Sequence, residues 1–238
     1  TIAYAVLAAS LNIGAFHEIV RQKELDAARL GENLAELRLQ TLRMQINPHF
    51  LFNSLNAVCV LVNKNERKSA VDMITKMSSF FRRTLEGGSE QWVSLDAELA
   101  MVAEYLAIAK FRFGERLQIR QTAEPAARAV KIPSMLLQPL VENAVVHGVA
   151  EHPGVCELEV NCRLRADRLS ITIRDDGAGG PPSHDPQFKE GVGLRNVRQR
   201  LEQLYGDDHS FTFESAPGRG ARVTIDVPAI VALRAAAA

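Results

Sequence analysis

The sequence predicts an α+β protein in which a helical hairpin, dimerised as a four-helix bundle, precedes an α/β sandwich. Two observations carry this prediction. Heptad-spaced apolar residues run into a second amphipathic helix before residue 90, as in helical hairpins. After Trp92, helical patterns and alternating strands follow one another without strict βαβ order, which favours a mixed or mainly antiparallel sheet covered by helices. With 47% apolar and 24% charged residues, composition is that of an ordinary globular chain.

The chain opens on an apolar stretch, TIAYAVLAASLNIGAF, and carries no Asp, Glu, Lys or Arg before Glu18. A spanning helix needs about 20 such residues. Because the stretch is short and the chain starts with Thr, we expect residues 1–16 to be the end of a cut transmembrane helix. The remainder would then face the cytoplasm from the inner or cytoplasmic membrane. An apolar helix that packs on a partner is the alternative.

Residues 17–90 are expected to form a coiled coil and a helical hairpin. Residues with seven-residue spacing make an a/d seam typical of a parallel dimer; these are Ala27, Leu30, Leu34, Leu37, Thr41, Met44 and Leu51. A single amphipathic helix in a monomeric bundle is the alternative. After the polar stretch 63–67, a second helix is predicted by Val71, Ile74, Phe81 and Leu85 on one face, and Gly87–Gly88 end it.

Residues 91–229 are expected to form the second domain, followed by a tail at 230–238. Ser94 can cap a helix that carries Leu95, Leu99, Val102 and Leu106. Two more helices are predicted at 135–148 and 194–205. Alternation predicts five strands, at residues 117–121, 156–164, 169–174, 211–214 and 221–227.

Charge and cysteine content exclude several classes of protein. The 28 basic and 28 acidic residues give a net charge of zero, which argues against direct nucleic-acid binding. The three cysteines, Cys59, Cys156 and Cys162, form no CxxC pair, so a disulfide framework or structural zinc site is poorly supported.

Glycines gather in two clusters of the second domain. Asp175 and Asp176 end a strand and lead into Gly177–Gly180; a carboxylate there can accept a hydrogen bond from an exocyclic amine such as that of adenine. The other cluster, Gly191 to Asn196, directly precedes a helix, whose free N–H groups favour phosphate. Taken alone, each cluster is also compatible with a tight turn.

Two further elements carry chemistry. Asn143 and His147 share a helix face, and the Asn143 carbonyl is a hard oxygen ligand suited to Mg²⁺. A buried amide and a helix C-terminal cation are the alternatives. In the other element, Asn47 to Asn53, Pro48 interrupts a helical pattern beside His49. Such local inconsistency is typical of functional sites, and neutral imidazole is a good nucleophile toward phosphorus.

These residues resemble a known family. The box Asn47-Pro48-His49-Phe50-Leu51-Phe52-Asn53 resembles the phosphoacceptor motif of LytS/YehU-type sensor histidine kinases. Similarity to the same family extends to residues 105–108, 112–114, 116–117, 139–144 and 147–148. Residues 175–179, 191–196 and 216–220 resemble the G1 motif, the G2 motif and the last glycine turn of the GHKL (Bergerat-type) ATPase fold. The similarity spans about residues 35–228.

The resemblance implies a role for each matched residue. His49 would take the γ-phosphoryl group of ATP, and Asn53, one turn later, would orient its imidazole. Asn143 would coordinate Mg²⁺, with Glu142 and His147 near the phosphates. The resemblance also implies an adenine site, in which Asp175 would bind the adenine amino group and Gly177 and Gly179 would shape the pocket. It further implies a mobile lid over residues 180–190. The hinge of that lid would comprise Gly191, Gly193 and Leu194, with Asn196 at its base.

Two departures from other histidine kinases leave the general base undefined: no acidic residue follows His49, and position 139 is proline. The implied function is ATP-dependent autophosphorylation within a homodimer and transfer to a response regulator, by family association one with a LytTR-type DNA-binding domain. A non-catalytic ATP-binding scaffold and a GHKL ATPase are the alternatives.

Overall fold

The computed structural model describes residues 48–86, 90–182, 185 and 190–231. The chain divides into two compact units, Thr1–Leu51 and Phe52–Ala238. The expected membrane helix (1–16) and most of the expected coiled coil lie outside the described residues. Within the described ranges, no helix combines the length and the apolar character needed to cross a membrane.

Two helices, α2 (Pro48–Asn63) and α3 (Arg67–Glu86), form the hairpin. The buried face of α3 packs on the next helix: the ring centroids of Phe80 and Tyr105 lie 6.1 Å apart, and Arg83 pairs with Glu104 at 2.9 Å. The predicted apolar face differs from this one, because Val71 and Ile74 are 64% and 52% exposed. Helix α3 therefore has two apolar faces, and among the residues that the structure describes only one of them is covered.

Helix α4 (Leu95–Phe113) begins where the sequence predicts. The Ser94 hydroxyl accepts a hydrogen bond from the Ala97 N–H at 3.2 Å, which satisfies one free donor of the first turn. Its predicted apolar face is buried, with Leu95, Leu99 and Val102 all at 0% exposure. The 3₁₀ turn η2 (Gly114–Arg116) then leads into the main sheet.

The main sheet has five strands in the order β2-β4-β5-β7-β6. Strands β2 and β4 are parallel and the other neighbours antiparallel, so the predicted mixed sheet is confirmed. Each strand matches its predicted range to within two residues: β2 (Leu117–Ala123), β4 (Cys156–Arg165), β5 (Arg168–Asp175), β6 (Ser210–Ser215) and β7 (Ala221–Pro228).

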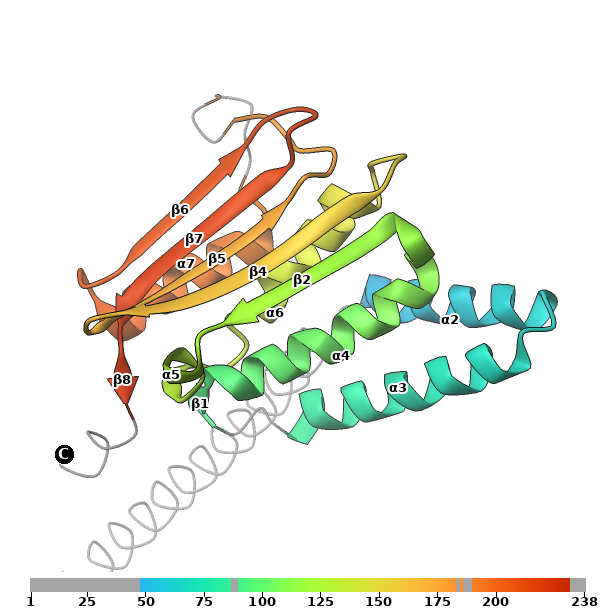
Figure 1. The fold of residues 1–238 in the computed structure, drawn as a ribbon, viewed down its shortest axis with the longest axis horizontal. Coiled ribbons are helices and arrows are strands. Elements are labelled where there is room, and N and C mark those ends of the chain that lie inside the picture. The colour runs from blue at the N-terminus through green and yellow to red at the C-terminus, as the bar shows by residue number, and fades with distance from the viewer. Residues whose placement is uncertain (1–47, 87–89, 183–184, 186–189, 232–238) are drawn as a thin grey trace, which may run out of the picture. The chain divides into compact units, whose positions relative to one another are not determined.

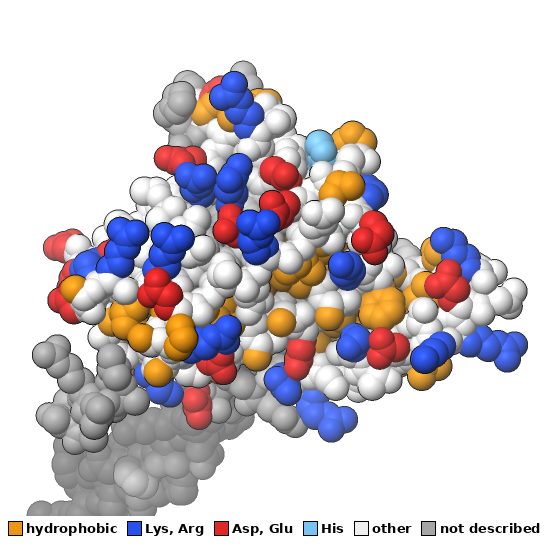
Figure 2. Space-filling view, in the orientation of Figure 1, with side chains coloured by type: hydrophobic (Ala, Val, Ile, Leu, Met, Phe, Trp, Pro, Cys, Tyr) orange, Lys and Arg blue, Asp and Glu red, His pale blue; other side chains and the backbone are white. Residues whose placement is uncertain are grey.

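One face of this sheet carries the core. Alternate residues such as Leu158, Val160 and Ile171 are buried, and helices α4, α6 (Gln138–Asn143) and α7 (Val192–Tyr205) cover that face (Figure 1). The other face is open, and basic and acidic side chains gather over the strands (Figure 2). The result is a two-layer α/β sandwich.

A second, three-stranded sheet was not predicted. It has the order β1-β3-β8, from β1 (Trp92–Ser94), β3 (Val130–Pro133), which follows the short helix α5 (Pro125–Arg128), and β8 (Ile230–Val231). Strands this short show too little alternation to be recognised. Strand β8 lies within the expected tail at 230–238. Because residues 230–231 pair with β3, they belong to the folded domain and not to the tail.

Candidate functional site

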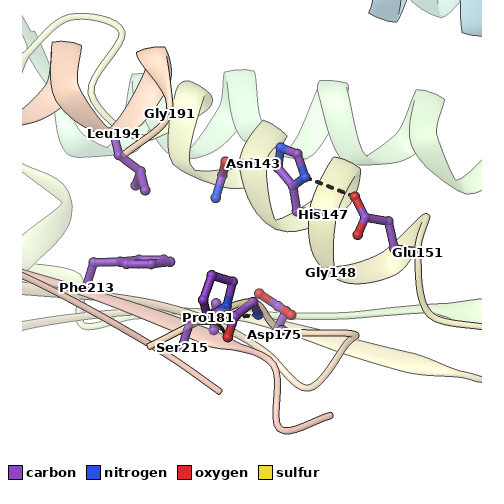
Figure 3. A pocket seen from close by; sticks show the side chains of 13 residues that line it. Asn143, His147, Gly148, Glu151, Asp175, Pro181, Gly191, Leu194, Phe213 and Ser215 are labelled. Carbon is purple, nitrogen blue, oxygen red and sulfur yellow. Dashed lines mark hydrogen bonds and ion pairs between the residues drawn. The ribbon is translucent and has the colours of Figure 1, made fainter. Parts of the chain in front are cut away.

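A cavity of about 430 Å³ lies between the helix that follows β3 and the ends of β5 and β6. Figure 3 shows Asn143, His147 and Glu151 on the helical side, with Asp175, Pro181, Phe213 and Ser215 facing them. Six predicted site residues line it: Asn143, His147, Asp175, Gly179, Gly191 and Leu194.

The helical wall is not the single helix predicted at 135–148. Residues 135–137 form a turn, α6 covers Gln138–Asn143, and the π-helical segment η3 continues from Ala144 to Val149. π-helical segments concentrate at functional sites because they re-aim side chains. Here the change of helix type falls directly after Asn143, between the two side chains that face the cavity.

A buried carboxylate holds the start of this wall. Glu98 of α4 is 3% exposed and accepts hydrogen bonds from the backbone N–H groups of Met135, Leu136 and Leu137 at 2.7, 3.0 and 3.0 Å. Burial raises the pKa of Glu98, and these three N–H groups oppose that shift. Met135 has φ of 58°, an unfavourable conformation for a residue with a side chain. The Glu98 carboxylate therefore stabilises a strained turn.

Asp175 forms the opposite wall at the end of β5. It is 2% exposed, and its Oδ1 accepts a hydrogen bond from the Gly177 N–H at 3.0 Å. Burial raises the pKa of Asp175, while the backbone N–H groups of Gly177 and Ala221 oppose the shift. A buried carboxylate in a cavity is a strong acceptor for a donor brought by a ligand.

Close backbone packing explains several glycines around Asp175. A Cβ atom on Gly148 would lie 2.7 Å from the Asp175 carboxyl carbon, and one on Gly177 would lie 2.6 Å from the Gly148 Cα. Gly179 has φ of 63°, and a Cβ atom there would overlap the Ala216 carbonyl. These glycines let the 177–180 loop pack directly against the end of η3.

Leu194 and Phe213 supply the apolar part of the cavity. Leu194 comes from the first turn of α7, and Phe213 from β6 on the opposite side (Figure 3). Beside them the Ser215 hydroxyl accepts a hydrogen bond from the Gly180 N–H at 2.7 Å, which anchors the loop. Leu194 and Phe213 thus give the cavity an apolar part beside the Asp175 carboxylate.

Four of the site residues predicted in the second domain do not line the cavity. Gly177 packs on the Gly148 backbone, and Gly193 lies within α7 near the Pro139 carbonyl. Asn196 borders a separate hollow with Gln91 and Arg200. It lies two residues after Leu194 on α7, and residues two apart on a helix point to nearly opposite sides. Glu142 accepts a hydrogen bond from the Gln138 amide at 2.8 Å and lies near Tyr105. The rotation of about 100° between adjacent helical residues directs its side chain away from that of Asn143.

The two predicted residues of the histidine box lie on α2. The structure describes His49 as part of that helix but not its side chain, and His49 belongs to the first of the two units. Asn53 follows four residues later and is half-buried. Gly191 adopts an ordinary extended backbone with φ of −64°, and a Cβ atom there would meet nothing within 4 Å.

Seven residues of the cavity wall were not predicted as site residues, and three of them, Glu151, Phe213 and Ser215, contribute polar or aromatic side chains. The Glu151 Oε1 atom lies 3.1 Å from His147 Nδ1. Because residues four apart share a helix face, the spacing from His147 could have pointed to Glu151. Phe213 and Ser215 alternate along an ordinary strand and gave no signal. Among the described residues, no group of three or more His, Cys, Asp or Glu side chains gathers to hold a metal unaided.

Two family models match parts of this chain. A family model described as "Histidine kinase" matches residues 37–117, and one described as "Histidine kinase-, DNA gyrase B-, and HSP90-like ATPase" matches residues 131–230. Among solved structures, the histidine kinase domain from Erythrobacter litoralis EL346 superposes with a TM-score of 0.46 at 16% identity, over 80% of this chain and 90% of that one.

Curated relatives are sensor kinases. The chain is 32% identical over 217 residues to Sensor protein LytS of Staphylococcus haemolyticus, covering 87% of this chain and 37% of that protein. It is 30% identical over 195 residues to Sensor histidine kinase BtsS of Escherichia coli K12, covering 82% and 34%. The chain thus spans roughly a third of these relatives. By its two matched regions and these relatives, the chain belongs to the histidine kinase family.

Proposed function

We propose that this chain binds ATP in the Asn143–Asp175 cavity, transfers the γ-phosphoryl group to His49 and passes it to an aspartate of a response regulator. The observation that carries the proposal is the cavity itself, which places a buried carboxylate opposite an amide, with an apolar floor between glycine-rich loops. The histidine box at residues 47–53 supplies the acceptor.

Adenine fits the Asp175 side of the cavity. Its exocyclic amine would donate to the Asp175 carboxylate, and its ring would lie against Leu194 and Phe213. Since Asp175 Oδ1 already accepts the Gly177 N–H, the carboxylate is fixed in place before the base arrives. The nucleotide would then extend toward Asn143 and His147 on the helical wall.

Asn143 is the residue that suits a magnesium ion. Its amide oxygen is a hard ligand, and Mg²⁺ ordinarily combines one or two protein oxygens with water and substrate phosphates. When bound, the ion would neutralise charge on the phosphates.

The chemical step needs a neutral imidazole. The lone pair of a His49 ring nitrogen would form the bond to the γ-phosphorus while the bond from that phosphorus to the bridging oxygen breaks and ADP leaves with its electrons. The proton on the other ring nitrogen would pass to solvent or a base. Asn53, at a spacing that shares a helix face with His49, would orient the ring.

Dimerisation is supported by apolar side chains left exposed on the hairpin. Phe52 and Val62 on α2 are 66% and 54% exposed, and Val71 and Ile74 on α3 are 64% and 52% exposed. A second copy of this hairpin would cover them in a four-helix bundle. We further propose that the apolar residues 1–16 attach this cytoplasmic region to the inner membrane and that the regulator is of the LytTR type.

The test is incubation of the full chain with γ-labelled ATP and Mg²⁺. We expect wild type to gain phosphate that is acid-labile and alkali-stable, and the variants His49→Ala and Asn143→Ala to gain none. Equal labelling of His49→Ala would overturn the proposed acceptor. Steady ATP turnover that survives loss of His49 would instead indicate an ATPase, and ATP binding without labelling or turnover would indicate a scaffold.

Mixed dimers decide which chain is phosphorylated. In a heterodimer of His49→Ala and Asn143→Ala chains, label on the chain that retains His49 means that phosphoryl transfer crosses between protomers. Absence of label in that heterodimer, with the wild-type homodimer active, means transfer within one protomer.

A further inference from the structure

The end of the helical wall is held by one arginine from another part of the domain. Arg116 donates to the backbone carbonyls of Val149 and Gly154 at 3.4 Å each, and also to that of His152. It lies in the turn η2 directly before β2, whose first residue, Leu117, pairs with Cys156 at the start of β4. Strand pairing therefore fixes the guanidinium beside the loop 150–155.

These carbonyls include groups that the helix leaves without an internal donor. Segment η3 ends at Val149, and the last carbonyls of any helix lack partners within it. A cation at that end also interacts favourably with the helix dipole. At the other end of the wall, Glu98 accepts three N–H groups. Glu98 of α4 thus holds the start of the wall and Arg116 of η2 holds its end.

Glu151 lies inside the segment that Arg116 holds. Its carboxylate meets His147 Nδ1 at 3.1 Å, and both side chains line the cavity although each is more than half exposed. Glu151 lies on the backbone between Val149 and Gly154, so the place of its carboxylate at the cavity and beside His147 depends on that segment. That backbone is the part that the Arg116 guanidinium fixes.

We propose that Arg116 is a positioning residue of the nucleotide site, which holds the His147–Glu151 wall in place through three carbonyls; the inference rests on the proposed function. The planar guanidinium offers donors in a fixed fork, whereas a lysine ammonium is a point charge on a flexible stem. Arg116→Lys therefore keeps the charge and loses the fork, and Arg116→Met loses both. Arg120, on β2 and paired with Glu157 at 3.1 Å on the open face of the sheet, is the matched control.

The experiment uses the full chain and three measurements: the Kd for ATP with Mg²⁺ by calorimetry, amide hydrogen exchange of residues 147–154 without nucleotide, and the unfolding temperature. We expect both Arg116 variants to raise the Kd about 10-fold, the usual effect of losing a residue that orients a ligand. Exchange at 147–154 should become faster in both, while Arg120→Met behaves as wild type.

Three outcomes overturn the inference. Wild-type affinity in Arg116→Lys would show that charge alone matters. A lower unfolding temperature with unchanged Kd in the folded protein would show a purely structural role. Unchanged exchange at 147–154 would show that Arg116 does not hold the loop. If wild type itself binds no ATP, the proposed function fails, and the exchange measurement still decides whether Arg116 positions this wall.

Discussion

Gly148 and Asp175 are in direct contact across the candidate site. A Cβ atom on Gly148 would lie 2.7 Å from the carboxyl carbon of Asp175, closer than any side chain can approach. Because Asp175 is itself fixed by the Gly177 N–H, neither partner can move aside without disturbing the loop. The residue at position 148 therefore controls the place of the carboxylate proposed to bind adenine.

Gly148→Ala tests this contact. We expect a loss of about 1–3 kcal/mol in the free energy of unfolding, the usual cost of an added methyl group in a packed site, together with weaker ATP binding. Gly191→Ala is the control for stability, since a Cβ atom at Gly191 meets nothing within 4 Å. Denaturant titrations compare the two, and equal stability of both variants would contradict the packing described here.

Asp175→Asn separates binding from stability. The variant keeps an oxygen for the Gly177 N–H but turns an N–H₂ group toward the adenine amine, so ATP affinity should fall by about 10- to 100-fold. Burial raises the pKa of Asp175, so the folded protein binds more protons than the unfolded chain between the ordinary and the raised pKa. Stability of wild type therefore falls as pH rises through that window.

The variant should lack this part of the pH dependence. We expect Asp175→Asn without nucleotide to gain stability relative to wild type at neutral pH, and the gain to shrink as pH falls toward the ordinary carboxyl pKa. Urea titrations across this range measure it. A gain that is the same at every pH would mean that ionisation of Asp175 is not its source.

Sequence predicted those parts of the fold that rest on local patterns. The main strands alternate over six or more residues and were placed to within two residues, and the Ser94 cap was found from its residue type. The sheet β1-β3-β8 was missed because its strands have two to four residues. The break at 135–137 depends on Glu98, 37 to 39 residues earlier, which no local pattern reveals.

The candidate site shows the same division. Asn143, His147 and Asp175 stood out because polar residues broke apolar patterns, and all three line the cavity. Phe213 continues its strand's pattern and becomes a wall residue only through tertiary packing. Asn196 and Glu142 were grouped with their motif neighbours, yet the helical rotation between adjacent positions turns them away from the cavity.

Glu98→Gln should destabilise the domain. A glutamine keeps one acceptor oxygen and replaces the other by an N–H₂ group. Depending on its orientation, that group faces the backbone N–H of Met135 or those of Leu136 and Leu137. Each buried donor left unpaired costs about 1–3 kcal/mol. Relief from burying a charge offsets part of this cost. Glu115→Gln, an exposed carboxylate in η2, is the control and should change stability by less than about 0.5 kcal/mol. Equal stability of the two variants would show that the three N–H groups do not depend on Glu98.

Ala166→Gly should stabilise the domain, although glycine usually weakens folded proteins. Ala166 lies in the two-residue turn between β4 and β5, where Arg165 pairs with Arg168, and its φ is 52°. This left-handed conformation strains a residue with a Cβ atom and is freely adopted by glycine. The exposed methyl group packs on nothing that the core needs. After the extra freedom of glycine in the unfolded chain is subtracted, we expect a gain of about 0.5–1 kcal/mol.

Ala103→Gly is the matched control for this last variant. Ala103 is also exposed but lies within α4, where the same substitution should cost about 1 kcal/mol because helical alanine is favoured over glycine. Urea titrations of the two variants should therefore shift the midpoint in opposite directions. A loss of stability in both would mean that the turn at residues 166–167 relaxes without strain, so that the positive φ of Ala166 has no energetic consequence.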